Sequence, residues 1–184
     1  VGHGSPMNAI EDSPYRRAWQ DLGAQFGVRW PKPKLILCIS AHWITPGWWL
    51  TGMSQPKTIH DFGGFPQALF DVEYPAKGNP ELAKATADLI TSTQVGLDHD
   101  WGLDHGTWTV LRHMYPKADI PVIQLSIDYT QPANYHYELA KQLQSIGEQI
   151  FMSFNGMGYA RMDFRMDAKG DIYFLEINFS KNAK

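Results

Sequence analysis

Four histidines stand in short strings beside glycine, serine or an acid. His3 lies in Gly-His-Gly-Ser-Pro and His42 in Ser-Ala-His-Trp, whereas His60 and His105 lie in Ile-His-Asp-Phe-Gly-Gly and Asp-His-Gly-Thr. Neutral imidazole nitrogens bind iron, zinc and copper well, and a histidine paired with a carboxylate can transfer protons. Four such strings, each expected at the end of an element, favour one shared site that combines metal binding with proton transfer.

His3 and His42 are the candidate metal ligands. The glycines on both sides of His3 let the backbone approach a ligand closely. His42 comes directly after the apolar run 34–40, and sites in open α/β sheets gather outside the carboxyl ends of the strands. Taken singly, each histidine is explained more simply as a turn or strand-end residue whose ring bonds to the backbone. The two together predict half of a metal site.

His60 and His105 are the candidate catalytic residues, because each is adjacent to an aspartate in the sequence. A carboxylate that bonds to an imidazole orients the ring and raises its basicity. Neighbouring residues seldom point the same way, so Asp61 and Asp104 are not assigned as the partners. The remaining histidines are expected to have other roles: His99 in a solvated loop, and His113 and His136 as structural residues of helices.

The elements that must position these histidines alternate between strand and helix. Capping residues and apolar periodicity predict helices, and continuous apolar runs predict strands buried on both faces of a sheet. The order indicates an α/β fold, with a central mixed sheet flanked by helices. The predicted helices cover 13–26, 79–91, 107–114 and 132–154, the predicted strands 34–40, 48–53 and 120–127, and the predicted loops 55–66 and 96–106.

The last stretch of the chain has a different character. Residues 159–166 and 172–178 alternate between apolar and polar, and the intervening Asp-Ala-Lys-Gly is a hairpin signal. The change falls near Gly147, inside the long predicted helix. We therefore predict an α/β domain over 1–147 and a segment of foreign character over 148–184.

Composition narrows the class of protein. The chain has 184 residues, a net charge of −3 and one cysteine, with 43% hydrophobic and 19% charged residues. This composition is typical of a soluble globular domain, and the absence of a basic stripe argues against a nucleic-acid partner. Without a signal peptide or a second cysteine, we expect a cytoplasmic protein that does not bind membranes.

Five strings, in order, resemble the 4,5-DOPA extradiol dioxygenases, relatives of the LigB class III ring-cleaving enzymes. They are GHGSPMNAI (2–10), SAHW (40–43), TIHDFGGFPQALF (58–70), YPAKGNPELA (74–83) and GLDHGTWTVLRHMYPKADIPVIQLSID (102–128). The resemblance implies a LigB-like α/β fold and an Fe(II) site, which zinc can occupy in isolated protein. It further implies a catecholic substrate such as DOPA, with O₂ as the second substrate. His3 and His42 would then be metal ligands, His105 an acid/base or substrate-binding residue, and His60 a residue of the same pocket.

Two departures from the family leave alternatives open. The family pattern continues past residue 147 with further histidines that complete its site, and this sequence has none after His136. The segment after 147 instead resembles the closing hairpin of an ATP-grasp ligase, such as D-alanine–D-alanine ligase. That resemblance would make Asp163, Glu176 and Asn178 ligands of Mg²⁺, an ion that prefers oxygen.

We therefore expect a chimeric, truncated chain, in which the loss of ligands impairs the dioxygenase. The alternatives are a non-catalytic metal-binding or inert fragment and a remnant of an ATP-grasp ligase. The sequence also leaves open a homo-oligomer, in which a neighbouring copy would supply ligands. The preferred catechol and the bond that is cleaved stay undecided.

Overall fold

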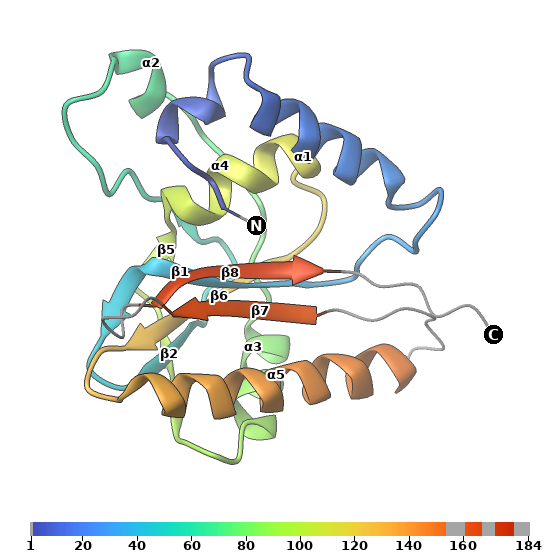
Figure 1. Cartoon of the computed structure of the whole chain (residues 1–184), viewed down its shortest axis with the longest axis vertical. Helices are drawn as coiled ribbons and strands as arrows, with labels where there is room; N and C mark the ends of the chain where they lie inside the picture. Colours follow the sequence, from blue (N-terminus) through green and yellow to red (C-terminus); the bar gives the residue numbers. More distant parts are fainter. Residues whose placement is uncertain (1, 154–160, 167–171, 179–184) are drawn as a thin grey trace.

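The computed structural model describes residues 2–153, 161–166 and 172–178, and its centre is a four-stranded mixed sheet (Figure 1). The strand order is β1-β6-β2-β4. β1 runs parallel to β6 and β2 parallel to β4, while β2 and β6 are antiparallel and pair at Leu50 and Leu125. The predicted central mixed sheet is thereby confirmed. Its strands are β1 (Ile36–Thr45), β6 (Val122–Asp128), β2 (Trp48–Thr51) and β4 (Val95–Asp98).

Helices cover both faces of this sheet (Figure 1). The helices α1 (Pro14–Gln25) and α4 (His105–Met114) lie on one face, and α3 (Pro80–Leu89) and α5 (Ala133–Ser153) on the other. Their starts follow the capping chemistry of the sequence: the side chains of Ser13 and Asn79 accept N–H bonds from the first turns of α1 and α3. Shorter elements are η1 (Pro6–Ala9), α2 (Gln67–Phe70), and the parallel pair β3 (Lys57–Thr58) and β5 (Gly102–Leu103).

Alternation along the strands divides the core into two clusters. On β1, Ile36 and Cys38 pack against the cluster that contains Trp108 of α4. Leu37 and Ile39 pack against the cluster that contains Leu139 of α5. Because each face of β1 packs against an apolar cluster, apolar residues are needed at successive positions, which explains residues 35–39 of the predicted run 34–40.

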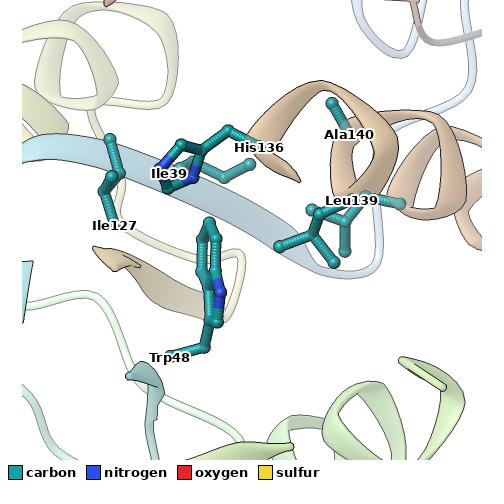
Figure 2. A pocket seen from close by; sticks show the side chains of 7 residues that line it. Ile39, Trp48, Ile127, His136, Leu139 and Ala140 are labelled. Atoms are coloured by element: carbon teal, nitrogen blue, oxygen red, sulfur yellow. The ribbon is translucent and has the colours of Figure 1, made fainter. Parts of the chain in front are cut away.

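A small apolar cavity lies on the α5 side of the sheet (Figure 2). The rings of His136 and Trp48 meet there edge to face, with their centroids 5.2 Å apart. His136 is 6% exposed, and its Nε2 lies 3.2 Å from the carbonyl oxygen of Gln131. Ile39 and Leu139 complete much of the lining. The apolar lining and the buried ring fit the structural role predicted for His136.

Several predicted boundaries were wrong. β1 extends to Thr45 instead of ending at Ser40, so His42 lies within the strand. The predicted loop 96–106 contains most of β4 and all of β5, and the predicted loop 55–66 contains β3. α4 begins at His105, two residues before its predicted start, because Asp104 is its N-cap.

The C-terminal strands β7 (Arg161–Met166) and β8 (Ile172–Asn178) form the predicted antiparallel hairpin. Asp163 is paired with Glu176 in the backbone register. The predicted turn 167–170 lies outside the described residues. Gly147 lies inside α5, so the predicted boundary falls within a continuous helix, and the division into two domains stays a prediction. No helix in the described ranges has both the length and the apolar character that crossing a membrane requires.

The contact between α1 and α4 yields a stability prediction at Gly23. A Cβ at this position would lie 2.7 Å from Cα of Met114 and would also collide with the carbonyl oxygen of Met114. We expect Gly23→Ala to lower the free energy of unfolding by about 1–3 kcal/mol, the usual cost of overpacking, although alanine favours helix. Urea denaturation measures this. Gly63→Ala is the matched control, since a Cβ there meets nothing within 4 Å; equal losses in both variants would contradict the packing argument.

Candidate metal centre

The first ring of the site, that of His3, is held by the turn that precedes η1. Gly4 has φ +62°, a conformation that glycine adopts without strain. The side-chain amide of Asn8 donates to the carbonyl oxygen of His3 at 3.0 Å, and Ser5 caps η1. Nδ1 of His3 is buried and has no hydrogen-bond partner among the described residues. The turn therefore fixes the backbone and directs the other ring nitrogen, Nε2, toward the remaining histidines.

His42 lies in a bulge near the end of β1. Ile39 pairs with Leu125 and Ile44 pairs with Ile127, so the four residues 40–43 stand opposite a single residue of β6. Such a bulge redirects the side chains of its strand, and bulges are frequent beside active sites. The bulge presents the ring of His42 at the carboxyl end of β1, the edge where the sequence predicts a site.

The third histidine, His105, is the first residue of α4 and is 5% exposed. Its Nδ1 lies 2.8 Å from Oδ1 of Asp61, and its backbone N–H donates to the same oxygen at 3.0 Å. The other carboxylate oxygen of Asp61 lies 4.0 Å from Nδ1 of His42. Asp61 thus orients the ring of His105 and leaves its Nε2 available to the site. The sequence did not identify this pair, whose members are 44 positions apart.

The three rings converge from these three segments. Nε2 of His3 and Nε2 of His42 are 2.8 Å apart. The ring centroid of His105 lies 4.7 Å from that of His3 and 4.0 Å from that of His42. One ligand nitrogen from each histidine lies within 4.8 Å of the other two.

Burial and repulsion from neighbouring rings keep the imidazoles of His3 and His42 neutral. Desolvation, followed by the nearby rings of His105 and His42, lowers the pKa of His3 to about 4. Desolvation also lowers the pKa of His42, and His105 adds to that effect. Burial opposes ionisation of Asp61, but the hydrogen bonds from His105 outweigh it and lower the pKa of that carboxyl. At neutral pH the site therefore holds the neutral imidazoles of His3 and His42 and the carboxylate of Asp61.

This donor set fits a transition-metal ion. Neutral imidazole is the ligating form, and the carboxylate behind His105 is the outer partner commonly found for a metal-binding histidine. The unpartnered Nδ1 of His3 leaves the tautomer of that ring free to present its Nε2 lone pair to a metal. His3 and His42, the predicted ligands, and His105, the predicted catalytic residue, are the residues that could hold or face the ion.

The structure does not bring His60 into this group. Its Nε2 lies 2.9 Å from the carbonyl oxygen of Val72. Its ring packs among aromatic side chains, with Phe62 at 5.8 Å and Trp108 at 5.5 Å between centroids. Phe62 also contacts the ring of His105 at 5.4 Å. His60 is thus one aromatic ring removed from the three histidines, and its catalytic role stays a prediction.

The other histidines lie away from the three-histidine group. His113 is buried on α4, its Nε2 lies 3.1 Å from the carbonyl oxygens of both Asn8 and Ala9, and its ring stacks on Trp19. His99 is exposed, as expected of a loop residue.

A buried polar network beneath the histidines was missed at the sequence level. Asp104 is fully buried and accepts hydrogen bonds from the hydroxyl of Ser40 and from the side-chain amide of Gln124. Burial raises the pKa of Asp104. A usable signal was the presence of Ser40 and Gln124 in otherwise apolar strand runs, since buried polar side chains require partners.

One comparison with known proteins bears on the predicted chimera. The chain is 32% identical over 66 residues to a D-alanine–D-alanine ligase of Saccharophagus degradans, a match that covers 36% of this chain and 21% of the ligase. The similarity is compatible with a chimeric chain. The proposed Mg²⁺ ligands Asp163, Glu176 and Asn178 stay a prediction, since their side chains lie outside the described structure.

The similarity of the larger part of the chain is much stronger. The chain is 50% identical over 153 residues to the 4,5-DOPA dioxygenase extradiol of Escherichia coli K12, a match that covers 83% of this chain and 55% of that relative. The crystal structure of an uncharacterized Escherichia coli K12 protein matches with a TM-score of 0.62 and 41% identity, over 79% of this chain and 53% of that one. This chain thus spans little more than half the length of these relatives. Residues 2–153 match the model of the catalytic LigB subunit of aromatic ring-opening dioxygenases, and the chain belongs to that family.

Proposed function

We propose that this protein is a metal-dependent extradiol dioxygenase that cleaves the ring of a catechol such as DOPA with O₂. The observation that carries the proposal is the convergence of His3, His42 and His105 at the carboxyl end of β1, in a chain of the LigB family. Fe(II) is the proposed cofactor, and Zn(II) is an ion that the same nitrogens would bind in isolated protein. When bound, a ferrous ion would lower the pKa values of the catechol hydroxyls and provide a position for O₂.

His3 and His42 would hold the ion through their Nε2 atoms, which lie 2.8 Å apart. Both rings are neutral at physiological pH, so no proton must leave before a metal binds. The turn at Gly4 and the bulge in β1 fix the two backbones, which limits the entropy lost when the ligands converge.

His105 would bind and release the protons of the catechol. Asp61 holds Nδ1 of His105, which leaves Nε2 as the ring atom that exchanges a proton with the substrate. The carboxylate also stabilises the imidazolium that forms when His105 accepts a proton. The opposite assignment, His105 as a third metal ligand, uses the same nitrogen.

The aromatic side chains beside His105 would face the catechol ring. Phe62 lies 5.4 Å from His105 and packs edge to face against Phe65 at 5.4 Å, centroid to centroid. Offset and edge-to-face contacts of this kind stabilise a flat aromatic ligand by about 0.5–1.5 kcal/mol per pair. His60, which packs behind Phe62, would support this wall.

The metal site is tested by ligand removal. We expect wild-type protein to retain about one Fe(II) per chain after anaerobic reconstitution, and His3→Ala and His42→Ala each to weaken binding by more than about 100-fold, beyond the effect of losing an outer partner. Metal analysis after gel filtration measures this. His99→Ala is the control, since that residue is an exposed histidine. Unchanged iron in both ligand variants would refute the site, and retained iron without oxygen uptake on DOPA or protocatechuate would favour a non-catalytic metal-binding protein.

The role of His105 is tested by separating metal content from turnover. We expect His105→Gln to lower the oxygen-uptake rate by about 10²–10⁴-fold, the usual contribution of a general acid–base residue, while iron content stays near that of wild type. Asp61→Asn should act in the same direction with a smaller effect, because it removes the charged partner of His105 but leaves the ring that exchanges the proton. Iron loss in His105→Gln as large as that in His3→Ala would instead make His105 a ligand.

The lowered pKa of His3 predicts how stability depends on pH. In the unfolded chain His3 takes up a proton near its ordinary pKa of 6.5, whereas in the folded protein it does so only near 4. Acid therefore favours the unfolded state, and the free energy of unfolding of the metal-free protein decreases as pH falls from 6.5 toward 4. We expect His3→Gln to flatten the dependence of the urea midpoint in that window. The exposed His99→Gln should not; equal slopes in all three proteins would contradict the burial of His3.

A further inference from the structure

We propose that Asp104 is a positioning residue that sets the places of His42 and His105 through a buried hydrogen-bond network. Its importance for catalysis rests on the proposed function, whereas its effect on the two histidines does not. Asp104 is fully buried, and its carboxylate touches none of the site's ligand nitrogens at hydrogen-bonding distance. It acts through Ser40, Thr107 and Gln124.

The first connection runs from Asp104 to the backbone of His42. The hydroxyl of Ser40 donates to Oδ1 of Asp104 at 2.8 Å and accepts the backbone N–H of His42 at 3.2 Å. This N–H lies in the bulge, where the register of β1 with β6 is interrupted. Donation to Asp104 fixes the hydrogen of this hydroxyl and leaves an oxygen lone pair for the His42 N–H, so Asp104 helps to hold the bulge in place.

The second connection fixes the start of α4. Asp104 is the N-cap, and its side chain accepts the N–H of Thr107 at 3.3 Å. Its own carbonyl oxygen accepts the backbone N–H groups of Thr107 and Trp108, both at 3.0 Å. His105 is the next residue, so its backbone direction follows from this cap.

The third connection ties both to the middle of the sheet. Nε2 of Gln124, on β6, donates to Oδ2 of Asp104 at 2.5 Å. Oε1 of Gln124 accepts the backbone N–H of Asp104 at 3.3 Å and the hydroxyl of Thr107 at 2.7 Å. Each oxygen of Asp104 accepts at least one hydrogen bond. The amide of Gln124 can make its own bonds in one orientation only, because its nitrogen donates to Asp104 while its oxygen accepts from Asp104 and Thr107.

Tight packing transmits any displacement to the rings. A Cβ placed on Gly106 would lie 2.7 Å from Cδ2 of His42, 3.1 Å from Oγ of Ser40 and 3.2 Å from Oδ1 of Asp104. The space between the network and the ring of His42 thus accommodates a glycine but no residue with a Cβ. Movement of Asp104 or Ser40 cannot be absorbed there without moving His42.

The network predicts an unusual rescue. Asp104→Asn sets its new amide N–H₂ against that of Gln124, and Gln124→Glu sets two carboxylates against each other. The double variant D104N/Q124E exchanges the two groups and restores every donor and acceptor with the same net charge. We expect each single variant to accelerate hydrogen exchange of the His42 amide by about tenfold or more, and the double variant to return it to within about twofold of wild type.

The experiment measures amide exchange by NMR in the metal-free protein and Co(II) affinity by titration. Co(II) binding should weaken by about 10–100-fold in each single variant, as for loss of an outer-shell partner, and recover in the double variant. Ser40→Ala removes the acceptor of the His42 N–H together with one donor to Asp104, and serves where a single variant fails to fold. The matched control is Asp128→Asn, a buried aspartate that accepts from Thr130 at the end of β6.

The outcomes separate positioning from general stability. Faster exchange at His42 in Ser40→Ala or Asp104→Asn, with rescue in D104N/Q124E and no such change in Asp128→Asn, supports the proposal. Uniform acceleration over the whole sheet, equal to that in Asp128→Asn, overturns it, as does a double variant no closer to wild type than the singles. Wild-type protein that binds no Co(II) would defeat the proposed function alone, because the exchange data still decide the role of Asp104.

Discussion

The rings of His3, His42 and His105 share a space of less than 5 Å, and a proton on His3 or His42 is unfavourable there. Desolvation, with repulsion from the neighbouring rings added to it, lowers the pKa of His3 to about 4 and lowers that of His42 as well. One carboxylate, Asp61, lies against the group and is already bonded to His105. The site thus combines ring lone pairs with one negative charge. This combination attracts a metal cation, while His3 and His42 resist protonation. A single divalent metal ion could take one nitrogen from each of the three rings.

Rings held this close together require fixed backbones, because contacts between imidazoles contribute little favourable free energy. The fold supplies three separate devices: a turn around Gly4, a bulge in β1 and the N-cap of α4. Each lies at the edge of a well-packed core, with Trp108 and Leu111 of α4 packed against the same face of the sheet as Cys38. The apolar cavity beneath α5 lies on the opposite face and contributes nothing to the site. The histidines are therefore supported by a packed core on one side, while His42 is exposed to solvent on the other. Metal binding requires the fixed ligands, and substrate binding requires the access.

Local signals in the sequence predicted what local interactions determine. Ser13 and Asn79 mark the starts of α1 and α3 because their side chains bond within the first turn, and the run 34–40 is apolar because each face of β1 packs against a core cluster. The extension of β1 to Thr45 carries no such signal: Ala41, His42 and Ile44 are exposed, and pairing with β6 decides it. The partner of His105 was missed for the same reason. Asp61 reaches it across 44 positions, while the adjacent Asp104 points into the core. The sequence strings around His3 and His42 made them candidates, and family resemblance, rather than periodicity, assigned them as metal ligands.

Asp104 shows how a buried charge can serve geometry more than stability. Removing a carboxylate from water costs several kcal/mol, and burial accordingly raises the pKa of Asp104. Against this cost stand hydrogen bonds from Ser40, Thr107 and Gln124, each worth about 1.5–3 kcal/mol to a charged acceptor. The two sums are of similar size, so the network adds little to the free energy of folding. The network instead favours one relative position of β1 and α4. A shift between these two elements would break hydrogen bonds to the buried carboxylate, and the position that keeps these bonds places His42 beside His105.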